Sequence, residues 1–316
     1  GLSDEHEGIL VLDDALTPGT PLADALGETV FEITSAALGA QDSLAQSQTE
    51  RFVLPLVYYT PETTWSFGVA GVMTFPTDSI SPRSQLQLGF AYTLQNQVLI
   101  YLPFQLYLRN DRLRFTGELG YYRYNYFFYG IGNAYEDIEG ELYGVNFPRV
   151  RASALWRTGA RHLTGLRYAW DYWEVYDQEP GGLLLTQEGV VGRDRSVYSA
   201  IGPVWQWDSR DHVFFPRKGS WIEASILNSN EFLGATQNFV KWSLDARTYW
   251  NPKGDRIWAG QVYVEGNSGT PPFNQLALLG RSVSRSSISG YTAGVSFPDQ
   301  GTVCGGGFRR HRKRGG

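Results

Sequence analysis

The sequence predicts an all-β protein, an antiparallel transmembrane β-barrel, and three observations lead to this fold class. Long segments alternate apolar and polar residues, which is the period-two pattern of a sheet with two different faces. Aromatic residues make up 15% of the chain, with 36 Gly but one Met and one Cys. No run of about 18 apolar residues is present, so no membrane-spanning helix is expected. A barrel with a polar lumen accommodates all three observations.

The bulk composition excludes several classes of function. The chain has 316 residues and a formal net charge of −5, which argues against a nucleic-acid partner. The single Cys304 rules out an internal disulfide and a cysteine metal site. The four histidines are scattered without metal-ligand spacing. We therefore expect no cofactor, no metal and no catalytic residue, and the one local Ser–His candidate, Ser220 near His212, is better explained as a strand-start serine.

Residues 1–50 differ from the remainder of the chain. Pro18, Pro21 and several Gly, Ala and Asp interrupt any regular pattern, and 43–50 is polar. No basic start followed by an apolar run is visible, so a signal peptide is not present in this sequence. We interpret 1–50 as a periplasmic leader or linker.

From Arg51 onward the strand signal is nearly continuous. The predicted strands, in order, are 52–59, 64–75, 84–94, 97–108, 111–124, 147–158, 162–175, 196–209, 219–228, 238–250 and 256–267. Most run about 10–14 residues, whereas strands in soluble sheets have a usual length of about 5–6. This length favours a membrane barrel over a soluble sandwich.

Charged residues recur on one face of several predicted strands. In 111–122, for example, Arg114 and Glu118 oppose Leu113 and Leu119. Residues of both signs on neighbouring strands suit pairing across a wet lumen. They could tune solute passage or anchor a plug loop, and they could equally be the ordinary lining of a wet barrel interior. The predicted lumenal charges are Arg112, Arg114, Glu118, Arg167, Asp171, Lys241, Asp245, Arg247 and Glu265.

Aromatic residues also gather near one predicted strand end, in a pattern typical of an interfacial girdle. The group comprises Tyr121, Tyr122, Tyr124, Tyr126, Phe127, Phe128 and Tyr129. Beyond it, Gly130, Gly132 and Asn133 predict a glycine turn where a long strand meets its loop.

The lengths of the connections predict an orientation. Those after the fifth, seventh, ninth and eleventh strands are long or moderately long, and those after the fourth, sixth and tenth are short. Outer-membrane barrels have short periplasmic turns and long outer loops. The connection at 208–219 is therefore expected at the periplasmic rim, with Trp207, Asp208, Arg210, Asp211, Pro216 and Gly219 forming a compact strand–turn–strand unit.

Four segments together resemble the bacterial surface antigen family, the BamA/TamA-like outer-membrane barrels. They are Val57–Gly71, Phe128–Asn133, Trp207–Asp211 with Phe215–Gly219, and Gln275–Gly280 followed by Gly290-Tyr291. The resemblance implies a sixteen-strand barrel, of which about eleven or twelve strands are present in 51–294. It also implies a seam between first and last strands, periplasmic domains ahead of the barrel, and a loop after strand eleven that folds into the lumen.

The chain departs from the family pattern in that loop. The family's Arg-Gly-Tyr element would need an Arg before Gly290, where Ser289 stands, so Leu279, Gly280, Gly290 and Tyr291 are only a remnant. The segment 295–316 ends in a basic tail unlike a strand. We hypothesise a C-terminal truncation or frame shift near residue 281, which comparison of the encoding DNA in all three frames would test.

The resemblance implies a function in inserting or exporting proteins or lipids at the outer membrane of a Gram-negative bacterium. Two alternatives remain open at this point, a pore-type barrel for small solutes and a structural surface-antigen barrel without a transport role. The expected partners are outer-membrane lipid and, through the resemblance, other outer-membrane proteins or periplasmic factors, with no nucleic acid.

Overall fold

The computed structural model describes residues 49–60, 64–131, 140–212, 216–252 and 257–276, and the backbone of the two-residue strands at 11–12 and 291–292. No helix in these residues is both long enough and apolar enough to cross a membrane. The described chain is instead dominated by strands.

Eleven long strands follow one another along the chain. They are β2 (Glu50–Thr60), β3 (Thr64–Phe75), β4 (Ser84–Thr93), β5 (Val98–Leu108), β6 (Leu113–Phe128), β7 (Glu141–Arg157), β8 (His162–Asp177), β9 (Arg195–Asp208), β10 (Gly219–Ser229), β11 (Phe239–Trp250) and β12 (Trp258–Gly269). The minor elements are β1 (Val11–Leu12), β13 (Tyr291–Thr292), α2 (Leu183–Thr186) and two 3-10 turns, η2 (Glu231–Leu233) and η3 (Phe273–Gln275).

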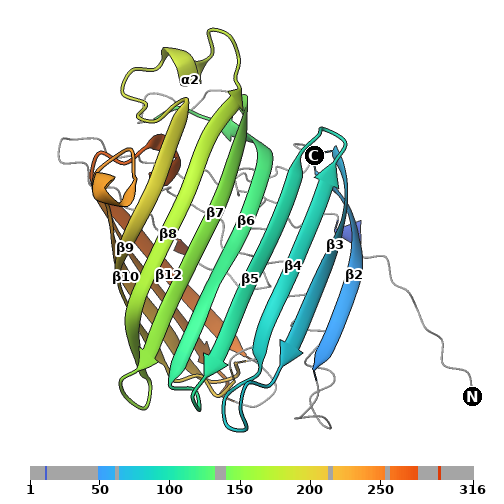
Figure 1. Cartoon of the computed structure of the whole chain (residues 1–316), viewed down its shortest axis with the longest axis vertical. Helices are drawn as coiled ribbons and strands as arrows, with labels where there is room; N and C mark the ends of the chain where they lie inside the picture. The colour runs from blue at the N-terminus through green and yellow to red at the C-terminus, as the bar shows by residue number, and fades with distance from the viewer. Residues whose placement is uncertain are drawn as a thin grey trace, which may run out of the picture.

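Each long strand pairs antiparallel with the next, so β2 to β12 form one meandering sheet. The sheet curls, with β2 to β9 as one wall and β10 to β12 returning behind it (Figure 1). Its strand order is linear, and the short strands β1 and β13 pair in parallel with β2 and β12 at its two ends. The architecture is a curled, open wall of a β-barrel.

The eleven predicted strands are all present, and for nine of them both ends lie within two residues of the prediction. The prediction was wrong for the ends of β6 and β7. Their ladder continues to the pair Phe128↔Glu141, past the predicted ends at 124 and 147. Cross-strand pairs such as Tyr124↔Val145 and Tyr126↔Tyr143 explain the extension, because aromatic and β-branched pairs stabilise a ladder.

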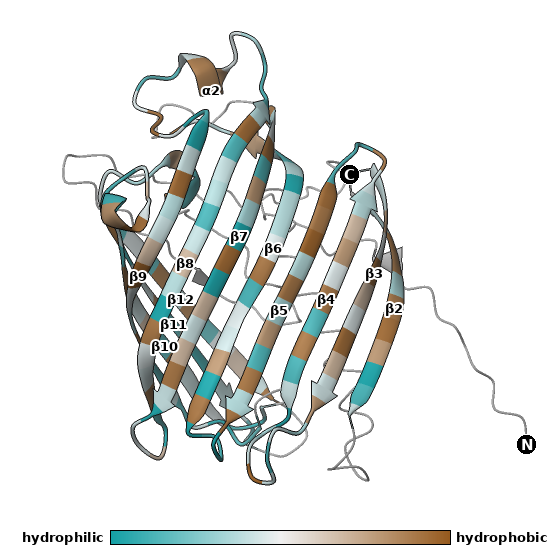
Figure 2. Cartoon of the chain, viewed as in Figure 1, coloured by the Kyte–Doolittle hydropathy of each residue, from teal (hydrophilic) through white to brown (hydrophobic). Residues whose placement is uncertain are grey.

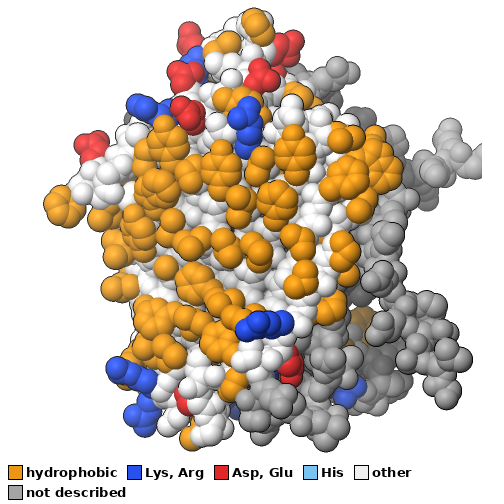
Figure 3. All heavy atoms as spheres, turned by 45° about the vertical axis from the view of Figure 1, so that its right-hand side comes forward, with side chains coloured by type: hydrophobic (Ala, Val, Ile, Leu, Met, Phe, Trp, Pro, Cys, Tyr) orange, Lys and Arg blue, Asp and Glu red, His pale blue; other side chains and the backbone are white. Residues whose placement is uncertain are grey.

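The two faces of the sheet have different chemistry, visible as bands along each strand in Figure 2. The outer, convex face carries exposed apolar side chains such as Phe67, Leu88, Leu119 and Leu166. Figure 3 shows this face largely covered by hydrophobic side chains, with charged groups concentrated toward its two ends. The inner, concave face carries most of the buried polar and charged residues. This is the arrangement expected of a wall between lipid and a polar lumen.

The connections differ between the two ends of the sheet. One end, here called the loop edge, carries 61–63, 94–97, 129–140, 178–194 with α2, and 230–238 (Figure 1). The opposite end, the turn edge, carries 76–83, 109–112, 158–161, 209–218 and 251–257. The two longest connections, 129–140 and 178–194, therefore lie at one edge, as the sequence predicts, whereas 209–218 at the other edge is longer than 230–238.

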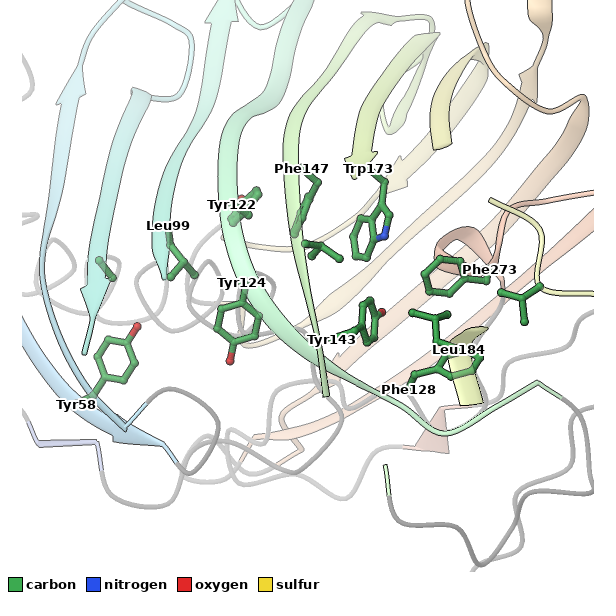
Figure 4. Close-up of a cluster of buried hydrophobic side chains, with 13 residues drawn as sticks. Tyr58, Leu99, Tyr122, Tyr124, Phe128, Tyr143, Phe147, Trp173, Leu184 and Phe273 are labelled. Carbon is green, nitrogen blue, oxygen red and sulfur yellow. The ribbon is translucent and has the colours of Figure 1, made fainter. Parts of the chain in front are cut away.

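An aromatic cluster lines the inner face near the loop edge (Figure 4). The rings of Tyr122 and Phe147 stack with centroids 4.6 Å apart, and those of Phe147 and Trp173 stack at 4.8 Å. The prediction that the group at 121–129 forms an interfacial girdle was therefore wrong for part of it. Tyr122, Tyr124 and Phe128 are buried in this cluster, because alternation along β6 turns every second ring inward.

Candidate functional site

The most highly organised polar site lies on the inner face across β6, β7 and β8. The carboxylate of Asp171, which is 1% exposed, accepts from Arg149 Nε at 3.0 Å and from an Arg151 terminal nitrogen at 2.9 Å. Arg149 also lies 3.5 Å from Glu118 Oε1. Two cations and two carboxylates thus form a neutral network, which is the condition for keeping charges inside a protein wall.

Strand register brings these four side chains together. Glu118 of β6 is directly opposite Arg151 of β7, and Arg149 of β7 is directly opposite Asp171 of β8. Directly paired residues of an antiparallel ladder point to the same face with Cβ atoms about 5 Å apart. The network is therefore a consequence of three aligned strands rather than of a loop.

Further ion pairs continue around the inner face. Arg167 of β8 reaches Glu223 of β10 at 2.8 Å, across β9, and Lys241 of β11 reaches Glu265 of β12 at 3.5 Å. Glu265 also accepts from Tyr263 Oη at 2.6 Å. Opposite charges separated by one strand or on adjacent strands hold the wall in register from the inside.

The segment after β12 turns back onto this inner face. Phe273 in η3 is buried and meets Phe128 and Trp173 edge to face, with centroids 5.9 and 6.3 Å apart (Figure 4). The Phe273 N–H donates to Val191 O at 2.9 Å. Gln275 Nε2 donates to Asp171 Oδ2 at 3.3 Å, and Gln275 O accepts from Asn267 Nδ2 at 2.8 Å. The segment 270–276 therefore links the last described long strand to the central ion-pair network.

The predicted motif at 207–219 forms the turn between β9 and β10. Arg210 donates to both carboxylate oxygens of Asp208, at 3.0 and 2.9 Å. Ser209 N donates to Ser220 O at 2.9 Å, and Ser220 N donates to Ser209 Oγ at 2.9 Å. Gly219 has φ +99°, and an added Cβ would lie 2.2 Å from Ser209 O, so only glycine fits.

Asp211 organises the middle of the same turn. Its Oδ1 accepts from the backbone N–H groups of Arg217 and Lys218 at 2.9 and 3.1 Å. These hydrogen bonds hold the pKa of Asp211 below its ordinary value, because they stabilise the ionised form. Trp207 lies on β9 opposite Ile222, and Pro216 precedes the start of β10. These contacts assign the described residues of the motif to turn geometry.

A second acidic residue joins two neighbouring connections of the turn edge. Asp78 Oδ2 accepts from Asn110 N at 2.9 Å, and Asp78 Oδ1 accepts from Ser81 N at 2.6 Å. The pKa of Asp78 is lowered to about 2, chiefly by the hydrogen bonds from the backbone N–H groups of Ser81 and Asn110. The connections 76–83 and 109–112 are thus clasped to each other. Asp78 is not among the residues predicted from the sequence, although an Asp followed by Ser three residues later in a Pro-flanked connection is a recognisable turn signal.

The predicted lumenal charges fall into three groups. Glu118, Arg167, Asp171, Lys241 and Glu265 belong to the inner-face ion pairs described above. Arg114 pairs with Asp111 at 2.7 Å and Arg247 with Asp245 at 2.8 Å, both nearer the turn edge. Arg112 is the exception and is a correction. It is exposed in the connection 109–112, because β6 begins one residue later at Leu113.

Three members of the network were not predicted, namely Arg149, Arg151 and Glu223. The signal was available in 147–158, where arginines alternate with Val150 and Ala152. Of the predicted glycine turn, Gly130 has φ +82°, whereas Gly132 and Asn133 lie outside the described residues. Leu279, Gly280 and Gly290 of the predicted loop remnant also lie outside them, and Tyr291 is described only as the backbone of β13.

The described part of the chain contains no group of three or more His, Cys, Asp or Glu side chains placed to hold a metal ion. The ion-pair network of this site has a structural role. It neutralises charge along the inner wall and attaches the segment 270–276 to it.

Comparison with known proteins places this geometry in a family. A family model described as the Omp85 superfamily domain matches residues 82–280. The structure is also similar to the crystal structure of BamA from Haemophilus ducreyi lacking POTRA domains 1-3, with a TM-score of 0.47 and 15% sequence identity, over 78% of this chain and 46% of that chain. The chain thus spans less than half the length of that structure. Comparison with curated proteins gave no match.

Proposed function

The chain belongs to the Omp85 superfamily, and from this premise we propose that it acts as an outer-membrane barrel of the assembly or translocation type, inserting or exporting proteins or lipids. The observation that carries the proposal is the family match, which covers 82–280 and so includes the strands of the ion-pair network and the segment 270–276. An outer-membrane location follows from the family, and its assignment to a Gram-negative bacterium is part of the proposal.

The orientation in the membrane is also part of this proposal. The loop edge faces the exterior and the turn edge faces the periplasm, because long loops lie outside and short turns inside in barrels of this kind. The motif around Asp208 and Gly219 then lies at the periplasmic rim, close to where periplasmic factors would approach. The apolar outer face contacts outer-membrane lipid.

The geometry of the inner face supports an assembly role over a simple pore. The segment 270–276 crosses toward Asp171, and Phe273 is buried among Phe128, Tyr143 and Trp173. An open pore needs a wet, continuous lumen, whereas here aromatic rings and neutral ion pairs line the inner wall. We infer that this lining keeps free solutes from passing along the inner face. Insertion or export would then take place at the strands and at the two edges of the barrel.

Folding of a reporter barrel tests the proposal. The protein is reconstituted in vesicles, an unfolded outer-membrane barrel is added, and its folding is followed by heat-modifiable mobility in gels. We expect a faster folding rate than in vesicles that contain an unrelated closed barrel at the same protein-to-lipid ratio. Equal rates in the two samples would refute the assembly function.

One observation favours the pore as a second candidate. Arg114, Arg167 and Lys241, each with its carboxylate partner, place charged side chains along the inner face, and rings of charged side chains set selectivity in channels. A pore predicts uniform conductance steps in planar bilayers and a change of ion selectivity in Arg114→Glu. The assembly proposal predicts no such uniform steps.

A further inference from the structure

A row of polar residues interrupts the apolar outer face near the loop edge. Arg123 of β6 is opposite Asn146 of β7, Asn146 is opposite Glu174 of β8, and Glu174 is opposite Arg195 of β9. Each of these residues belongs to the alternating set that faces outward on its strand. The row therefore crosses four strands at one level.

The level of the row coincides with the end of the continuous apolar stretch on β6, beyond which the exposed side chains of Phe127 and Leu142 follow. On β6 the outward residues from Leu113 to Tyr121 are apolar, glycine or tyrosine, and Arg123 follows directly. Nine residues at about 3.3 Å each, tilted by about 40°, span about 22 Å, close to the apolar band of about 25 Å in barrels of this type. Val98, the first residue of the shorter strand β5, is paired with Arg123. The row thus lies where hydrocarbon gives way to headgroups.

Arg123 differs from the arginines of the inner face. Its guanidinium carbon lies 4.3 Å from the ring centroid of Tyr176, whose Oη donates to Asn125 Oδ1 at 3.0 Å. Among the described residues, no carboxylate lies within ion-pair distance of Arg123. Glu174 is two strands away, about 10 Å at the usual strand spacing. The guanidinium is therefore held by an aromatic ring and by no carboxylate of the described residues.

Asn146 adds an unused hydrogen-bonding group beside Arg123. Its Oδ1 is buried and has no hydrogen-bond partner within the described structure. An amide nitrogen is a donor, and Asn146 Nδ2 is neither among the buried atoms nor in a hydrogen bond with any described residue. This nitrogen is therefore the donor that is available to a phosphate oxygen next to Arg123.

We propose that Arg123 and Asn146 form a binding site for the phosphate of a membrane lipid headgroup in the leaflet at the loop edge. A guanidinium offers a planar fork of donors that matches phosphate oxygens, and the Asn146 amide supplies one more donor. The acyl chains would run down the apolar surface over Tyr121 and Pro148. This inference rests on the membrane location given in the proposed function.

Lipid retention by the folded protein tests the site. The full chain is purified in a zwitterionic detergent, titrated with dioleoyl phosphatidic acid or dioleoyl phosphatidylcholine, and analysed by native mass spectrometry. We expect phosphatidic acid to bind more tightly than phosphatidylcholine. R123Q should weaken the binding of phosphatidic acid about ten-fold, because this is the usual contribution of one hydrogen bond to a charged group. The control R161Q removes an exposed cation at the turn edge and should change binding less than two-fold.

The outcomes separate the possibilities. Equal binding by R123Q and the unchanged protein, or an equal loss in R161Q, would overturn the proposal. Displacement of phosphatidic acid by millimolar inorganic phosphate would assign a simple anion site and also overturn it. If R123Q does not fold, R123K replaces it in the test. Lysine keeps the positive charge but loses the planar fork of guanidinium donors, so undiminished binding of phosphatidic acid by R123K would contradict the proposal. The reporter-folding rate of the unchanged protein is independent of lipid retention, so either conclusion can fail without the other.

Discussion

Asp171 is the residue on which the inner-face network depends most. It is almost fully buried, and Arg149, Arg151 and Gln275 all donate to it. Removing one partner from a buried ionic network is costly because the opposite charges remain without compensation. The network therefore makes a specific prediction for the loss of this one carboxylate.

The variant Asp171→Asn is expected to lower the free energy of unfolding by about 3 kcal/mol, because two arginines lose their shared counter-charge. Urea unfolding in vesicles, followed by tryptophan fluorescence, measures the change. Asp177→Asn makes the same chemical change at an exposed position at the end of β8 and should have an effect below about 0.5 kcal/mol. Similar losses in both variants would show that Asp171 has no special role.

Gly219 makes a second prediction at the residue scale. Alanine there combines a positive φ with a Cβ placed against Ser209 O, whereas alanine at Gly234 has a positive φ but open space around it. We expect Gly219→Ala to destabilise the protein by about 3 kcal/mol and Gly234→Ala by about 1 kcal/mol. The ratio of the two values, measured by the same unfolding experiment, checks the geometry of the β9–β10 turn.

At the scale of the elements, the turn edge is held by side chains that bridge connections. Asp78 joins 76–83 to Asn110, and Ser81 Oγ accepts from Asp111 N at 2.6 Å. The ionised carboxylate of Asp78 makes the first bridge, and it also accepts from the Ser81 hydroxyl that makes the second, at 2.7 Å. The clasp is therefore expected to depend on pH.

The sign of this dependence follows from the lowered pKa of Asp78, about 2 against an ordinary value of about 3.9. Because the folded state binds the proton more weakly, the contribution of Asp78 is complete above pH 4 and is lost as the pH falls toward 2. We expect Asp78→Asn to be less stable than the unchanged protein at pH 7 and equally stable near pH 2. Urea midpoints at several pH values give the comparison, and a constant difference across the range would contradict it.

The individual strands could be predicted well from the sequence, but the pairing of side chains between strands could not. Alternation in segments such as 111–122 predicts both the strand and the inward side of Arg114 and Glu118, because period two is a local property. The pairing of Arg149 with Asp171 depends on the register of β7 and β8, which no local pattern encodes. The contacts of Phe273 and Gln275 could not be predicted either. A short 3-10 turn has no periodicity, and the residues that it contacts are distant in the sequence.

At the scale of the whole molecule, the two faces of the sheet imply a lipid-facing exterior. Leu88 lies in the middle of β4 on the outer face, and Leu94 lies beyond the end of the same strand at the loop edge. Lysine on a lipid-facing surface costs about 2–4 kcal/mol at the bilayer midplane and about 0–1 kcal/mol near the interface.

We therefore expect Leu88→Lys to destabilise the protein in vesicles by about 3 kcal/mol and Leu94→Lys by less than about 1 kcal/mol. The two variants introduce the same side chain at exposed leucines, one within β4 and one just beyond its end, so depth is the variable that differs. Unfolding in vesicles measures both. Equal effects would mean that the convex face does not contact lipid.

The proposed assembly function and the closed inner face are tested together by one experiment on one sample. Vesicles that contain the protein and an encapsulated small dye receive an unfolded reporter barrel, and reporter folding and dye release are recorded simultaneously. We predict faster reporter folding than in vesicles with an unrelated closed barrel, with the dye retained until the reporter is added. Steady dye release before that addition, without faster folding, would contradict the account and identify a pore.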